Sequence, residues 1–65
     1  MPKDSEIEEA ARIVIKKHGV AAVWAAELRA KRLSEDGQVS AAAIWRRIAE
    51  VIRRIQADEA DPSAE

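Results

Sequence analysis

The stretch VSAAAIWRRIAEVIRRIQA, residues 39–57, decides the fold of this chain. Its apolar residues recur at steps of three and four, and arginines occupy positions between them. Because an α-helix has 3.6 residues per turn, this spacing predicts an amphipathic helix that turns one face toward a core. The residues predicted to be buried are Ala41, Ile44, Trp45, Ile48, Val51, Ile52 and Ile55.

Two more helices are expected before this one, over residues 5–18 and 20–35. Their apolar residues are Ile7, Ala10, Ala11, Val14 and Ile15 in the first, and Val23, Ala26, Ala30 and Leu33 in the second. Ser5 and Glu8 have the spacing of a capping box, which predicts that the first helix begins at residue 5. Gly19 and Gly37 follow the two patterns and indicate helix ends, because glycine adopts left-handed backbone without strain.

The connections between these helices are short, so consecutive helices must lie side by side or meet at a sharp angle. The sequence therefore predicts an all-α fold: a compact three-helix arrangement (about 5–18, 20–35 and 39–57) with short turns that contain glycine. Dimerisation into a helical bundle is an open option. If Gly19 lies inside a bent continuous helix, the fold is instead a hairpin of two long helices. We expect a single domain over residues 5–57, with disorder in residues 1–4 and in the acidic tail 58–65.

The composition argues against catalysis. The chain has 65 residues, no cysteine and one histidine, His18, which excludes disulfides, thiolate metal sites and His-based zinc clusters. No serine or carboxylate is placed to act with His18, and its position at the end of the first helix favours an interaction with the helix dipole. We therefore expect no enzymatic activity, no cofactor and no small-molecule ligand.

Location in the cell is also indicated by composition. No apolar run approaches the ~20 residues needed to cross a bilayer, and residues 1–9 are acidic without an apolar signal core. The absence of cysteine fits a reducing compartment. We expect a cytoplasmic protein that does not engage a membrane.

Charge is segregated along the chain, although the net charge is only −1. Residues 1–9 and 57–65 are acidic, whereas residues 10–56 carry ten lysines or arginines against four carboxylates. Arginine pairs recur at seven-residue spacing on one face of the third helix, and they are the candidate nucleic-acid contacts: Arg46, Arg47, Arg53 and Arg54. The acidic pI of about 5.8 and the presence of only two aromatic residues favour a solvated face instead.

The two tryptophans direct attention to a protein interface. Three short, alanine-rich helices form only a small hydrophobic core. Large apolar side chains that stay outside such a core indicate an interaction site. Trp45 lies within the predicted stripe of the third helix and Trp24 at the edge of the second, where it could anchor an interface. We expect a non-enzymatic protein–protein interaction module, either a homodimer or bound to a small protein partner. Nucleic-acid binding is the alternative. The candidate interface residues are Ile13, Ile15, Trp24 and Trp45.

A pattern of single residues runs through residues 11–55, about two thirds of the chain. It consists of His18-Gly19, Arg29-Ala30, Leu33, Gly37, Trp45, Ile48 and the apolar run from Ile52 to Ile55. This pattern resembles that of small uncharacterised helical proteins of alphaproteobacteria. Gln38 stands where such proteins often have aspartate after the turn glycine. No activity attaches to that family, so the resemblance implies a helical fold and a bacterial origin only.

Overall fold

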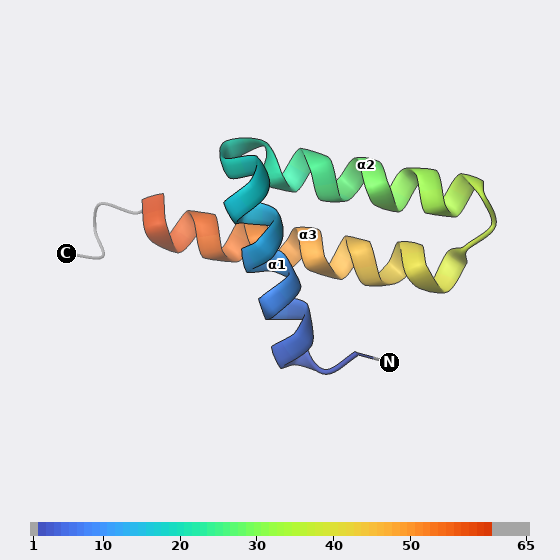
Figure 1. Cartoon of the computed structure of the whole chain (residues 1–65), viewed down its shortest axis with the longest axis horizontal. Coiled ribbons are helices and arrows are strands. Elements are labelled where there is room, and N and C mark those ends of the chain that lie inside the picture. The colour runs from blue at the N-terminus through green and yellow to red at the C-terminus, as the bar shows by residue number, and fades with distance from the viewer. Residues whose placement is uncertain (1, 61–65) are drawn as a thin grey trace.

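The computed structural model describes residues 2–60, and it is helical throughout its regular parts (Figure 1). It contains α1 (Asp4–His18), the short 3₁₀ helix η1 (Gly19–Ala21), α2 (Ala22–Glu35) and α3 (Val39–Ala60). No strand occurs among these residues. The prediction of a compact all-α fold is therefore confirmed.

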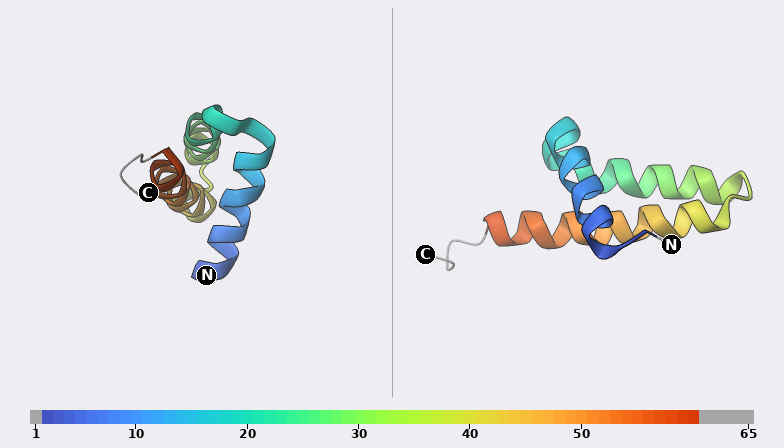
Figure 2. Two further views of the ribbon diagram at one scale, coloured as in Figure 1. Left: turned by 90° about the vertical axis from the view of Figure 1, so that its left-hand side faces the viewer. Right: turned by 60° about the horizontal axis from the view of Figure 1, so that its bottom comes forward.

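The helices form a hairpin with a crossing arm. α2 and α3 lie side by side and run in opposite directions, while α1 crosses them at a steep angle (Figures 1 and 2). The end-on view in Figure 2 shows α1 lying against one side of the pair. The short connections predicted by the sequence thus produce both expected geometries, an antiparallel turn and a sharp corner.

No separate loop connects α1 and α2. η1 follows α1 directly, so the described chain consists of two uninterrupted helical runs, residues 4–35 and 39–60, of which the first is bent. Gly19 ends α1 as predicted: its φ is 57°, and its backbone N–H still donates to the carbonyl of Ile15. The structure therefore combines both alternatives that the sequence left open, a helix end at Gly19 and a bent continuous helical path.

The predicted capping box does not form. α1 begins at Asp4, one residue earlier than expected, with Lys3 as its N-cap residue and no side-chain hydrogen bond at the cap. The N–H groups of Glu6 and Ile7 donate to the carbonyl of Lys3, at 2.9 and 3.0 Å. Because the helix starts early, Ser5 lies inside the first turn and cannot serve as the cap.

The second turn, around Gly37, follows the prediction. Gly37 has φ 80°, and its N–H donates to the carbonyl of Ser34, while the N–H of Gln38 donates to that of Leu33. This pair of hydrogen bonds is a Schellman motif, which satisfies the last carbonyls of α2 and reverses the chain. α3 ends at Ala60 rather than at the predicted residue 57, and the remainder of the predicted tail, residues 61–65, lies outside the described residues.

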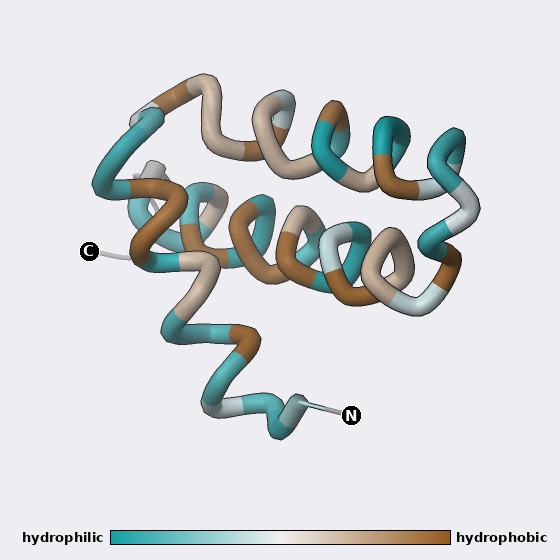
Figure 3. Tube along the Cα trace, turned by 45° about the vertical axis from the view of Figure 1, so that its right-hand side comes forward, coloured by the Kyte–Doolittle hydropathy of each residue, from teal (hydrophilic) through white to brown (hydrophobic). Residues whose placement is uncertain are grey.

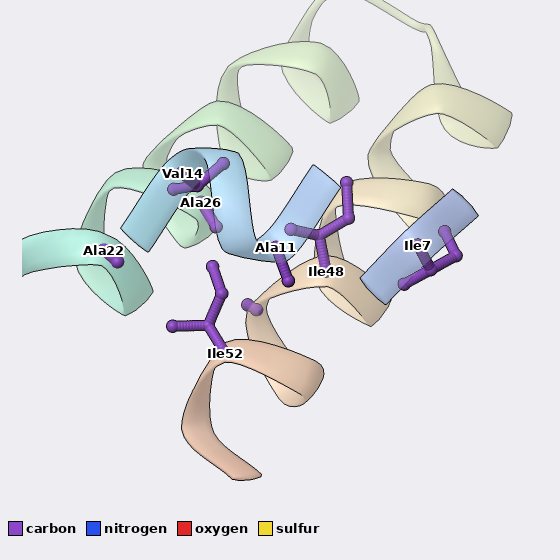
Figure 4. Packing of buried hydrophobic residues seen from close by; sticks show 8 residues of the cluster. Ile7, Ala11, Val14, Ala22, Ala26, Ile48 and Ile52 are labelled. Atoms are coloured by element: carbon purple, nitrogen blue, oxygen red, sulfur yellow. The ribbon is translucent and has the colours of Figure 1, made fainter. Parts of the chain in front are cut away.

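The core is small and rich in alanine. Six of its ten buried hydrophobic residues are alanines, and Ile52 is the largest side chain that is completely buried. Figure 4 shows Ile48 and Ile52 of α3 facing side chains of α1 and α2. The full set is Ile7, Ala11, Val14, Ala22, Ala26, Ala30, Ala42, Ile48, Ala49 and Ile52.

The apolar stripe predicted for α3 does face the core, but the prediction missed two buried residues. Ile48 and Ile52 are buried, and its other large members are partly buried against the core. Ala42 and Ala49 were not predicted, yet both are buried, and Ala49 lines a cleft between α2 and α3 together with Ala30. Small residues on both helices let α2 approach closely, which widens the contact face of α3.

Hydrophobic and hydrophilic residues alternate along all helices, as Figure 3 shows. Within residues 2–60, no helix combines the length and the apolar character that crossing a bilayer requires.

Candidate interaction surface

Large hydrophobic side chains are exposed chiefly near the bend between α1 and α2. Ile13 is 62%, Val20 99% and Trp24 66% exposed, and these three residues lie within six positions of Gly19. The other large exposed hydrophobic residue is Val39, 68% exposed, at the opposite turn. Ile13, Val20 and Trp24 are called the apolar corner below.

Helix periodicity explains why these side chains face solvent. Ala22 and Ala26 mark the buried face of α2, and Trp24, two residues from each, lies on the opposite face. In α1, Val14 turns toward α3, and Ile13 is about 100° away around the helix. The corner is thus the consequence of placing bulky residues off the buried stripes.

The four predicted interface residues do not form one surface. Ile13 and Trp24 are exposed, whereas Ile15 and Trp45 are partly buried and pack against the core. Ile13 and Ile15 lie about 200° apart on α1, so a single flat partner cannot contact both. Val20 was not among the predicted interface residues; its place directly after the helix-ending Gly19 was the available signal.

Ile13 and Trp45 both line a groove of about 320 Å³ that residues of α1, α2 and α3 form. The guanidinium carbon of Arg29 lies 5.8 Å from the centre of the Trp45 ring, within cation–π distance. The remaining lining residues are Val14, Lys17, His18 and Ala25. Trp24 does not line this groove.

The predicted arginine face is divided by neighbouring carboxylates. Arg47 forms an ion pair with Asp4 of α1, and Arg53 forms one with Glu27 of α2. Glu50 lies between the arginine pairs, one turn from each. Two of the four arginines are thus used to tie α3 to the other helices.

The cleft between α1 and α3, about 500 Å³ in volume, carries charges of both signs. Three arginines and three carboxylates line it: Arg46, Arg47, Arg54, Asp4, Glu8 and Glu50. Equal numbers of opposite charges do not produce the uniformly positive potential that attracts a phosphate backbone.

The corner is also held by a contact from α3. Nε2 of Gln56 donates to the carbonyl oxygen of Gly19 at 2.8 Å, and the backbone N–H of Ala22 donates to the same oxygen. Gln56 therefore bridges the end of α3 to the bend.

Within residues 2–60, no group of three or more His, Asp or Glu side chains is placed to hold a metal ion. The resemblance to small alphaproteobacterial proteins stays a prediction from the sequence. No known family model, curated protein or solved structure matches this chain.

Proposed function

We propose that this chain is a non-enzymatic protein interaction module that self-associates through its apolar corner. The observation that carries this proposal is the exposure of Ile13, Val20 and Trp24 around one bend. Tryptophan is among the residues most enriched at the energetic centres of interfaces, because it buries a large area with little loss of side-chain entropy.

Stability supports an association. A 65-residue chain with a core made largely of alanine buries little apolar surface, and it has no cysteine to add a disulfide. Covering the apolar corner would remove further apolar surface from water and stabilise the folded chain by mass action.

A second copy is the occupant that fits this patch best. In a twofold dimer the same patch meets itself, so an apolar area on one chain is covered by an equally apolar area on the other. Between Ile13 and Trp24 the chain also carries the exposed Lys16 and Lys17, and the exposed Glu27 follows Trp24 in α2. Such a mixed border avoids like-charge repulsion between two identical patches.

Sedimentation and light scattering over a micromolar concentration range test the proposal. We expect a concentration-dependent dimer for the native chain, and a dissociation constant raised by roughly tenfold or more in Trp24→Lys. A native chain that stays monomeric over the whole range while remaining folded would refute self-association.

Val39→Lys is the matched control. Val39 is as exposed as Trp24 but lies at the turn between α2 and α3. The same charge introduced there should leave the dimer unchanged. Equal weakening by both substitutions would show that added charge, rather than loss of the corner, opposes association.

Nucleic-acid binding through Arg46, Arg47, Arg53 and Arg54 is the less favoured alternative. The ion pairs of Arg47 and Arg53 and the position of Glu50 argue against a continuous basic face.

A further inference from the structure

The bend between α1 and α2 is centred on Gly19, the residue there whose backbone departs furthest from helical values. Gly19 has φ 57° and ψ −127°, whereas His18 has φ −114° and ψ −12°, and Ala21 has φ −89° and ψ 5°. Rotation of Gly19 into the right-handed region, with changes of about 50° in the φ of His18 and the ψ of Ala21, joins α1, η1 and α2 into one straight helix over residues 4–35. No loop has to refold, because none exists.

A straight helix brings the apolar corner into register. At about 100° per residue, Ile13, Val20 and Trp24 fall within about 40° of one another around such a helix. In the bent chain these three residues belong to α1, η1 and α2. Straightening therefore aligns the three residues of the apolar corner along one face of a single helix.

Straightening also separates α1 from its own α3. The buried residues of α1, Ile7, Ala11 and Val14, belong to the same cluster as Ile48 and Ile52 of α3. Once α1 extends away from the hairpin, both surfaces are uncovered. A second copy offers the same α3 surface to α1, with the same contacts.

We infer that two copies of this chain exchange their α1 helices, with Gly19 as the hinge. The inference rests on the proposed self-association and states how it occurs. Ile13 and Trp24 are equally far in sequence from the peptide bond between His18 and Gly19. A twofold axis at that point therefore places Ile13 of one chain and the partner's Trp24 at the same distance from the point where the two straight helices cross, and we expect this crossing to cover the apolar corner.

Crosslinking between single-cysteine variants tests the exchange, since the native chain has no cysteine. Asp4 of α1 and Arg47 of α3 form an exposed ion pair, so Asp4→Cys and Arg47→Cys mark the two surfaces with little effect on the fold. Equal amounts of the two full-length variants, one carrying a mass tag, are mixed, unfolded and refolded together. They are then treated with a short bismaleimide.

We expect a covalent pair containing one chain of each variant, because α1 of one chain lies on α3 of the other. Each variant treated alone should give no comparable product. A dimer by sedimentation without the mixed product would overturn the exchange and leave the proposed self-association standing. A monomer at every concentration would overturn both.

A second pair of cysteine sites distinguishes a hinge at Gly19 from one at Gly37. Glu27 of α2 and Arg53 of α3 also form an ion pair, and they stay within one chain when only α1 is exchanged. Mixed Glu27→Cys and Arg53→Cys variants should therefore give no interchain product. If both site pairs crosslink between chains, the hinge is at Gly37 and the inference is wrong.

Gly19→Ala should favour the exchange. An added Cβ at Gly19 meets no atom within 4 Å, so the substitution strains only the backbone of the bent form. That strain shifts the ratio of straight to bent chains by roughly fivefold or more and raises the yield of the Asp4–Arg47 interchain product. Gly37→Ala, at the other positive-φ glycine with equally open surroundings, is the control and should not raise that yield. An equal rise in both variants would contradict the assignment of Gly19 as the hinge.

Discussion

Ile48 shows how much a single side chain contributes to a core of this size. It is 4% exposed and belongs to a cluster to which α1, α2 and α3 all contribute. The neighbouring residues are largely alanines, which have no side-chain freedom to move into a cavity.

We predict that Ile48→Ala lowers the free energy of unfolding by ~2–5 kcal/mol, a large part of the stability that a domain of this size can have. Thermal and urea denaturation followed by circular dichroism measure the loss. Ile13→Ala removes the same atoms from an exposed position and should change stability by less than about 0.5 kcal/mol at concentrations where the chain is monomeric. Equal effects at the two positions would mean that Ile48 is not a core residue.

At the scale of the helices, the α2–α3 hairpin and the α1 arm are held in different ways. The hairpin is joined by a four-residue-spaced row of alanines and by a Schellman turn, both local in sequence. α1 is held by three buried side chains, the exposed Arg47–Asp4 pair and the contact of Gln56 with Gly19. Exposed ion pairs contribute ~0–1 kcal/mol, so most of the attachment of α1 comes from its buried residues.

Hydrogen exchange should reveal this difference. We predict that the backbone amides of α1 exchange about tenfold faster or more than those in the middle of α2 and α3, because α1 can detach while the hairpin persists. Mass spectrometry or NMR at concentrations where the chain is monomeric measures the rates. Uniform protection of all helices would contradict a separable arm.

The sequence predicted the helices better than their arrangement. Apolar periodicity and the two glycines located every helix to within a few residues, because both signals are local. The crossing angle of α1 depends on the ψ angle of Gly19, and a glycine accepts many values, so it was not predictable. Two of the three residues of the apolar corner, Ile13 and Trp24, were predicted as interface residues, whereas Val20 was not, because only packing shows which side of each helix is covered.

At the scale of the whole molecule, the distribution of charge argues against nucleic-acid binding, the alternative function. Basic residues concentrate in the helical body, but carboxylates of α1, α2 and α3 stand among the arginines. Long-range attraction of a phosphate backbone depends on the summed field of all these groups, not on the arginines of one helix.

We therefore predict no salt-sensitive complex with duplex or single-stranded DNA at low ionic strength. Fluorescence anisotropy with labelled oligonucleotides between 20 and 200 mM salt, a range over which ~6–10 phosphate contacts would change affinity 10³-fold or more, provides the test. A complex that weakens steeply with salt and is lost in Arg46→Glu with Arg54→Glu would instead establish the nucleic-acid alternative.

The ion pair between Asp4 and Arg47 joins residues 43 positions apart. Because of this separation, α1 is synthesised first, and the surface of α3 on which α1 packs emerges only after the turn between α2 and α3. Closing so long a loop costs more conformational entropy than closing the short turn of the hairpin. This cost must be overcome before α1 gains any burial against α3, so we expect this contact to form late. A newly made α1 therefore lacks its contacts with Ile48 and Ile52 until α3 is complete, and where several chains are translated from one message, the first complete α3 that it meets can belong to a neighbour.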